Sequence, residues 1–261
     1  MYIETMKKIV KETDTIFFDE KLRQDVMEKG VSDYVTRADI EISAYLHRRL
    51  LEEYPEMGFV SEEEELTAFD ADNKAYWILD PIDGTTNFIH QMKMSAVSLG
   101  LCMNDEVVAG VIYNPYTGEM FWAEKGKGAY LNETPICCSN NAQLSECLGI
   151  VDYNPYHKED YLEAFRLCYE VYTNCQDVRT LGSAAMEMAY IACGRADVFI
   201  GRYLKPWDYA AGLLIVREAG GIVNGIHHRI SLKEMNTHII AANSLVYEEF
   251  SKIISPKYKK I

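Results

Sequence analysis

The sequence predicts an α/β (α+β) protein whose two halves are built differently. In the first half, helical segments precede a run of short strands with turn residues between them, which is typical of an antiparallel meander. In the second half, strands and helices alternate, which is typical of an α/β layer. A chain of 261 residues with 48% hydrophobic and 25% charged residues has the composition of a globular protein that buries its own core.

Spaced apolar residues predict helices at the start of the chain. They recur at roughly helical spacing over residues 2–28 and more clearly over residues 37–53, up to Pro55. A short strand is expected at residues 58–60. The compact apolar run from Tyr76 to Leu79 predicts a buried strand, and residues 95–132 carry the pattern of the antiparallel strands.

The second half repeats one pattern. Short apolar runs predict strands at 148–151, 178–181, 197–200 and 239–242. Helices are expected at 157–172, 183–194 and 208–219, with a final helix after the last strand that ends at about 254. No linker rich in proline or serine separates the halves. We therefore expect residues 1–145 and 146–261 to pack tightly as one unit.

Charge and cysteine content narrow the class of function. A formal net charge of −14 disfavours direct nucleic-acid binding, because it repels phosphate backbones. Seven cysteines without a Cys-x-x-Cys pair predict reduced thiols. The chain starts without an apolar signal segment, and its longest nearly apolar stretch, Tyr209 to Val216, is too short to span a bilayer. A cytoplasmic protein without membrane contact is expected.

The strongest chemical signal follows the strand predicted at 76–79. The string Asp80-Pro81-Ile82-Asp83-Gly84-Thr85-Thr86 places two carboxylates three residues apart, and such oxygen ligands select Mg²⁺, Mn²⁺ or Ca²⁺. Gly84 allows close approach of the backbone to a ligand, and the two threonines open a short helix whose free N–H groups suit a phosphate oxygen. The alternative is a strand ending in a capped turn, but the complete string favours the metal and phosphate site.

Three further segments carry acids that suit the same site. The run from Glu62 to Glu65 is either a solvated face or the source of one or two inward-pointing carboxylates. Asp208 begins an apolar helix whose residues 210–212 are small, so it is either an N-cap or a ligand pressed against the site. Asp39 lies early in a helix and either balances the helix dipole or orients a hydroxyl. Lys205 is either a phosphate contact or a surface charge, and a surface charge is the expectation.

These residues resemble the motifs of a known family. Asp80 to Asn87, then Trp207-Asp208-Tyr209-Ala210-Ala211-Gly212, then Glu218-Ala219-Gly220-Gly221 are similar to the inositol monophosphatase family, over about residues 29–244. That family belongs to a lithium-sensitive, magnesium-dependent superfamily with fructose bisphosphatases and nucleotide phosphatases. The resemblance implies a layered α-β-α-β-α sugar-phosphatase fold, a homodimer and inhibition by lithium.

The resemblance also implies roles for individual residues. The implied metal ligands are Glu62, Asp80, the Ile82 carbonyl, Asp83 and Asp208, holding two or three Mg²⁺ ions, with Mn²⁺ as a possible replacement. The implied catalytic residues are Glu63, which helps to hold a weaker third ion or its water, and the pair Thr85 and Asp39, which orients the attacking water. The implied substrate contacts are Asp83, Gly84, Thr85, Gly182, Ser183, Ala184 and Asp208, with Lys29 near the site.

A phosphomonoesterase that attacks with metal-activated water is the activity that the resemblance implies, and inositol 1-phosphate is its leading substrate. One position departs from the family: a glutamate that contacts inositol hydroxyls in the animal enzymes falls at Gly201, with Arg202 beside it. Arg202 is therefore expected to contact a substrate with extra negative charge. The alternatives are the 2′-phosphate of NADP, fructose 1,6-bisphosphate, and a regulatory binding protein on the same fold.

Overall fold

The structure is a computed structural model that describes residues 2–63, 74–226 and 229–257. Its larger sheet has the strand order β3-β4-β5-β6-β7-β8-β9, in which only β3 and β4 are parallel. These strands are β3 Gly58–Ser61, β4 Ala75–Asp83, β5 Ala96–Met103, β6 Glu106–Asn114, β7 Glu119–Glu124, β8 Ala129–Leu131 and β9 Thr134–Ile136. The antiparallel meander expected in the first half is confirmed.

The smaller sheet comes from the second half and has the order β11-β10-β12-β14-β13. Its strands are β10 Leu148–Asp152, β11 Asp177–Arg179, β12 Val198–Leu204, β13 Gly221–Gly225 and β14 Thr237–Asn243. Strand β10 runs parallel to β11 and β12, whereas β14 is antiparallel to β12 and β13. A separate hairpin joins β1 Val26–Gly30 to β2 Asp33–Thr36.

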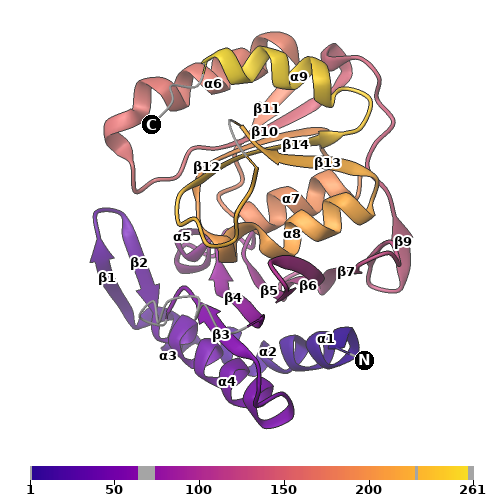
Figure 1. The fold of residues 1–261 in the computed structure, drawn as a ribbon. Helices are drawn as coiled ribbons and strands as arrows, with labels where there is room; N and C mark the ends of the chain where they lie inside the picture. Colours follow the sequence, from indigo (N-terminus) through magenta and orange to yellow (C-terminus); the bar gives the residue numbers. More distant parts are fainter. Residues whose placement is uncertain (1, 64–73, 227–228, 258–261) are drawn as a thin grey trace.

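Helices fill three layers around the two sheets (Figure 1). Helices α1 (Tyr2–Glu12) and α4 (Arg37–Glu53) cover the outer face of the larger sheet. Between the sheets lie α7 (Ala184–Ala192) and α8 (Pro206–Glu218), and the far face of the smaller sheet carries α6 (Tyr161–Asn174) and α9 (Tyr247–Ile254). The short helices are α2 Asp14–Phe17, α3 Glu20–Gln24 and α5 Thr85–Ile89. This confirms the α-β-α-β-α order.

Small residues bring α8 close to the larger sheet. A Cβ built on Gly110 of β6 would lie 2.9 Å from the Ala211 carbonyl oxygen, and one built on Gly100 of β5 would lie 3.3 Å from Ala210. Larger side chains on either surface would hold the helix away. The close packing matters for function because it fixes the N-terminal turn of α8, which carries Asp208, beside the larger sheet.

A bulge in β4 turns two aspartates the same way. The strand does not end at Leu79 as expected but continues to Asp83. Asp80 pairs with Ser98 and Asp83 with Ala96, so three residue steps on β4 face two on β5. Residues three apart point to opposite faces of a regular strand, and the extra residue of a bulge removes that difference. Pro81 suits this bulge, since it has no N–H to donate to the ladder.

The N-terminal expectation was too simple. Residues 2–28 form α1, α2, α3 and the start of β1 rather than one helical stretch. The breaks have local causes: the Thr13 hydroxyl bonds to the Val10 carbonyl at the end of α1, and the Asp19 carboxylate accepts the first N–H groups of α3. Strand β13 and the β1-β2 hairpin, whose strands are short, were not predicted from the sequence.

Two other expectations concern the whole chain. All seven cysteines are free thiols, as expected. Within residues 2–63, 74–226 and 229–257, we find no helix with the length and apolar character that a bilayer span requires.

Candidate active site

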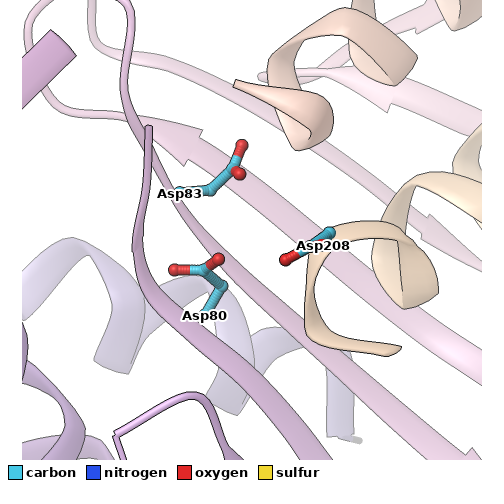
Figure 2. Close-up of side chains that lie close together, drawn as sticks. All are labelled: Asp80, Asp83 and Asp208. Atoms are coloured by element: carbon cyan, nitrogen blue, oxygen red, sulfur yellow. The ribbon is translucent and has the colours of Figure 1, made fainter. Parts of the chain in front are cut away.

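Three aspartates from distant parts of the chain meet at the edge of the larger sheet (Figure 2). Asp80 and Asp83 come from β4, and Asp208 comes from the first turn of α8. One carboxylate oxygen from each lies within 4.8 Å of the others. A contact between the elements supports this arrangement. Ser98 of β5, which pairs with Asp80 of β4, donates a hydrogen bond of 3.2 Å to the carbonyl oxygen of Trp207, the residue before Asp208.

Each aspartate is held through one oxygen. Asp80 Oδ1 accepts a 3.0 Å bond from the Ile82 N–H, and Asp208 Oδ2 accepts a 2.7 Å bond from the Lys205 N–H. Asp83 Oδ2 accepts from the Ser183 hydroxyl and, at 2.8 Å, from the Ala185 N–H. Such outer hydrogen bonds orient metal ligands and leave the second oxygen of each carboxylate for a cation.

The electrostatics of the three aspartates favour a bound cation. Burial, together with the neighbouring acids, raises the pKa values of Asp80 and Asp208 well above the ordinary range. Burial also raises the pKa of Asp83 to about 7, against the opposing effect of the Ser183 hydrogen bond. Three acids this close cannot all ionise cheaply by themselves, and a hard divalent ion with oxygen ligands removes that cost. The residues present therefore fit Mg²⁺ or Mn²⁺.

This arrangement predicts a stability that depends on pH and on magnesium together. Asp83 has a higher pKa in the folded than in the unfolded protein. Without a cation, its contribution to folding stability is therefore fully present below about pH 4 and is lost as pH rises through about 7. Magnesium binds the deprotonated form, so its stabilising effect should grow with pH. At a hundredfold excess over the dissociation constant we expect Tm to rise by about 5 °C at pH 8.

The measurement is Tm between pH 5.5 and 8 in EDTA and in MgCl₂, with NaCl at equal ionic strength as the control. A magnesium effect of the same size at both ends of that range would contradict the prediction.

A second acidic pair lies beside the aspartates. Glu62 lines the same pocket, and burial raises its pKa to about 7 despite the nearby Lys29 ammonium. Lys29 Nζ lies 2.7 Å from Glu63 Oε1 and 3.5 Å from Glu62 Oε1, so this lysine reaches the site from the β1-β2 hairpin. Glu64 and Glu65 lie outside the described residues. The structure thus brings Glu62, Glu63 and Lys29 to the site.

Asp39 and Thr85 form a contact at the floor of the site. Asp39 is buried and accepts hydrogen bonds from the N–H and the hydroxyl of Thr36, which makes it part of a capping box at the start of α4. The Thr85 hydroxyl lies 3.3 Å from Asp39 Oδ1 and 3.0 Å from the Ile82 carbonyl oxygen. Burial raises the pKa of Asp39 to about 7, with the Thr36 hydrogen bonds opposing that rise.

A pocket of about 580 Å³ lies beside these groups. Glu62, Asp80 and Thr85 are among its lining residues, whereas Asp39 and Glu63 are not. Of the expected substrate contacts, it is lined by Asp83, Gly84, Thr85, Gly182, Ala184 and Asp208. Ser183 lies behind the lining, where its hydroxyl holds Asp83. Ile82 and Lys29 also line the pocket.

Arg202 does not reach the pocket, which corrects the expectation that it contacts substrate. Its side chain is fully buried, 3.1 Å from Glu163 Oε2 and over the ring of Tyr203. A register shift between Gly201 and Leu204 breaks the regular pairing of β12 at this point. The arginine is thus held among protein groups, and Glu163 of α6 balances its charge there.

We expect Arg202→Met to act on stability alone. The change removes a buried cation and leaves Glu163 without it, at a cost of about 2 kcal/mol, which is less than for a fully buried pair because Glu163 keeps some solvent contact. Urea unfolding measures that loss, and KM for inositol 1-phosphate should stay within twofold of the wild-type value. A tenfold rise in KM would restore Arg202 as a substrate contact.

Several residues of the pocket lining were not predicted to be site residues from the sequence. Asp152 ends β10, Asn154 and Tyr156 follow it, and Lys205, which was expected to be a surface charge, also lines the pocket. The only signal for Asp152 is an acid at the end of a strand, and burial raises its pKa. Lys205 directly precedes Pro206 and the α8 turn, so its place in the site follows from the place of Asp208.

The chain is similar to known proteins over nearly its whole length. Residues 2–257 match the Inositol monophosphatase family. An inositol-1-monophosphatase of Synechocystis sp. is 37% identical over 236 residues, which cover 89% of this chain and 80% of that protein. A fructose-1,6-bisphosphatase/inositol-1-monophosphatase of Thermotoga maritima is 35% identical over 244 residues, covering 92% and 90%. The crystal structure of the extragenic suppressor protein suhB from Bartonella henselae has a TM-score of 0.89 at 33% identity and covers 97% of this chain and 98% of its own. The chain belongs to the inositol monophosphatase family.

Proposed function

We propose that this protein is a magnesium-dependent phosphomonoesterase that hydrolyses a small phosphorylated metabolite, with inositol 1-phosphate as the leading substrate. One observation carries the proposal: Asp80, Asp83 and Asp208 converge within 4.8 Å, each oriented through one oxygen, at the floor of a pocket. The family membership supports divalent metal use. The site takes ligands from residues 1–145 and 146–261, so the two parts act as one unit.

Glu62, Asp80, the Ile82 carbonyl, Asp83 and Asp208 would hold the metal, as two or three Mg²⁺ ions or Mn²⁺ in their place. When bound, these ions lower the pKa of a water and neutralise charge on the phosphoryl group. The chain itself supplies orientation. Gly84 and Thr85 would contact the phosphate, the Thr85 hydroxyl and Asp39 would orient the attacking water, and Glu63, which pairs with Lys29, would help to hold a weaker third ion or its water.

The charges around the pocket bear on the substrate. Gly201 offers no carboxylate, and Lys205 adds a cation to the pocket lining, where its Nζ donates a 2.7 Å hydrogen bond to Asn236 Oδ1. A cation in this position suits a second phosphate, which keeps fructose 1,6-bisphosphate and the 2′-phosphate of NADP as alternatives. The name of the Thermotoga relative joins a fructose-1,6-bisphosphatase to an inositol-1-monophosphatase, which supports testing both substrates.

Release of inorganic phosphate in MgCl₂ tests this proposal. Inositol 1-phosphate, NADP and fructose 1,6-bisphosphate are compared at equal concentration, with and without LiCl. Magnesium-dependent release from one of them supports the phosphatase and names its substrate class. A folded protein that binds Mg²⁺ but releases phosphate from none of them favours the regulatory binding protein on the same fold, a reading that the suppressor name of the Bartonella relative keeps open.

The proposal extends to assembly and location. Helix α6 exposes a stripe of large side chains, which are Tyr161, Leu162, Phe165, Tyr169 and Tyr172. Aromatic residues of this kind are enriched at protein interfaces, so the stripe supports a homodimer. Free cysteines throughout the chain support a reducing compartment such as the cytoplasm. Sedimentation of the wild-type protein and of Phe165→Glu tests the dimer, which should dissociate in the variant.

A further inference from the structure

A buried acid on α7 lies behind the metal cluster without lining the pocket. Glu187 is fully buried in the first turns of the helix. Its Oε1 accepts a 2.7 Å hydrogen bond from the Leu181 N–H and a 3.1 Å bond from the Gly182 N–H. Its Oε2 is buried and makes no hydrogen bond to any residue that the structure describes. The site described above does not use this side chain.

The loop that Glu187 holds lies outside the hydrogen-bonded strands. Residues 180–183 join β11 to α7, and Gly182 adopts a φ of +74°. Asn87 on α5 donates to the carbonyl oxygens of Leu181 at 2.7 Å and Gly182 at 3.2 Å. Glu187 takes the two N–H groups of the same dipeptide. Leu181 and Gly182 are therefore clamped from both sides, carbonyls by Asn87 and amides by Glu187.

The next residues of the chain hold a metal ligand. The Ser183 hydroxyl and the Ala185 N–H both donate to Asp83 Oδ2, and these two groups are the partners that orient that carboxylate. Any rotation of the 181–182 peptide moves Ser183 and changes the direction of Asp83. Removing one outer partner of a metal ligand costs 10- to 100-fold in metal affinity in comparable sites.

We propose that Glu187 is a positioning residue: by holding the amides of Leu181 and Gly182, it fixes Ser183 and Ala185 and thereby aims Asp83 at the metal. The inference rests on the proposed function. The clamp needs an acceptor oxygen and not a charge. Burial, with Asp152 adding to it, raises the pKa of Glu187 well above its ordinary value, which favours the neutral form. A glutamine at this position should therefore still accept the two N–H groups, whereas an apolar side chain of the same length should not.

The test compares Glu187→Gln with Glu187→Met and measures binding of Mn²⁺ alone by electron paramagnetic resonance of the free ion. We expect the Met variant to bind Mn²⁺ about tenfold or more weakly and the Gln variant to stay within about threefold of wild type. The kcat of the Met variant should fall at limiting Mg²⁺ and recover in part at high Mg²⁺.

Met188→Ala is the matched control. Met188 is the next residue on the same helix, is equally buried, and packs against Gly212 of α8, away from the 181–182 loop. This variant should lose thermal stability and keep the Mn²⁺ affinity of wild type, which separates a loosened helix from a misaligned ligand.

Four outcomes decide the matter. Wild-type affinity in the Met variant, or equal loss in the Gln and Met variants, overturns the positioning role and leaves the phosphatase proposal intact. Wild-type protein that binds no Mn²⁺ overturns both. If the Met variant does not fold, Glu187→Asp decides: its carboxylate is one methylene too short to reach both amides, so weaker Mn²⁺ binding supports the clamp and unchanged binding overturns it.

Discussion

Asp80→Asn is expected to lower kcat by on the order of 10³-fold while making the metal-free protein more stable. Asparagine keeps the shape of the side chain and the oxygen that accepts the Ile82 N–H, so the bulge of β4 is preserved. The charge is lost. Outer partners of metal ligands are worth 10- to 100-fold in activity, so the loss of a direct ligand should exceed that range.

The gain in stability has the same physical origin. Asp80 is 2% exposed, and burial and repulsion from Glu62, Asp83 and Asp208 raise its pKa. Without a cation, its ionised form is therefore a cost that the neutral amide does not carry. In EDTA at pH 8 the variant should melt at a higher temperature than wild type, and MgCl₂ should raise its Tm less.

Phosphate release and thermal unfolding in EDTA and in MgCl₂ measure the two effects. Asp177→Asn is the matched control, because Asp177 is an exposed acid of β11 that pairs with Arg179. It should leave both properties near wild type. An Asp80→Asn protein that keeps a tenth of the wild-type kcat would show that Asp80 is not a ligand, and a fall in its Tm in EDTA would show that repulsion does not dominate this cluster.

Local patterns made much of the fold predictable. The helix at 37–53 agrees with α4 residue for residue, since its apolar stripe is long and Pro55 follows its end. The segments that were missed are those in which distant partners decide the structure. Residues 26–30 become a strand because 33–36 pair with them, and β13 forms against β14 although it contains glycines at both ends.

The same division holds in the site. Asp80, Asp83, Gly84 and Thr85 lie in one string, so their chemistry was visible from neighbours in sequence. Asp83, however, is oriented by Ser183, one hundred positions away in the chain. The sequence around either residue does not predict that contact. The prediction for Arg202 was wrong because it relied on position in the sequence alone. The register shift in β12 places this side chain within reach of Glu163.

Gly84→Ala is expected to destabilise the protein by about 4 kcal/mol and to weaken metal binding as well. Gly84 has a φ of +86°, a conformation that costs other residues about 1–2 kcal/mol. A Cβ there would also lie 2.8 Å from the Gly182 carbonyl oxygen, 3.0 Å from the Met94 carbonyl oxygen and 3.1 Å from Ser183 Cβ. Backbone atoms cannot move aside cheaply, so overpacking adds about 1–3 kcal/mol.

Gly220→Ala separates the two costs. Gly220 has nearly the same φ, +85°, and a Cβ there meets nothing within 4 Å. Its loss, measured by urea unfolding, should be the conformational cost of about 1–2 kcal/mol alone. The difference between the variants is then the clash with the 182–183 segment. Because that segment holds Asp83, the Gly84 variant should also need more Mg²⁺ for half-maximal activity, whereas the Gly220 variant should not. Equal destabilisation of the two variants would mean that the 182–183 segment yields freely, and a segment that yields freely could not aim Asp83.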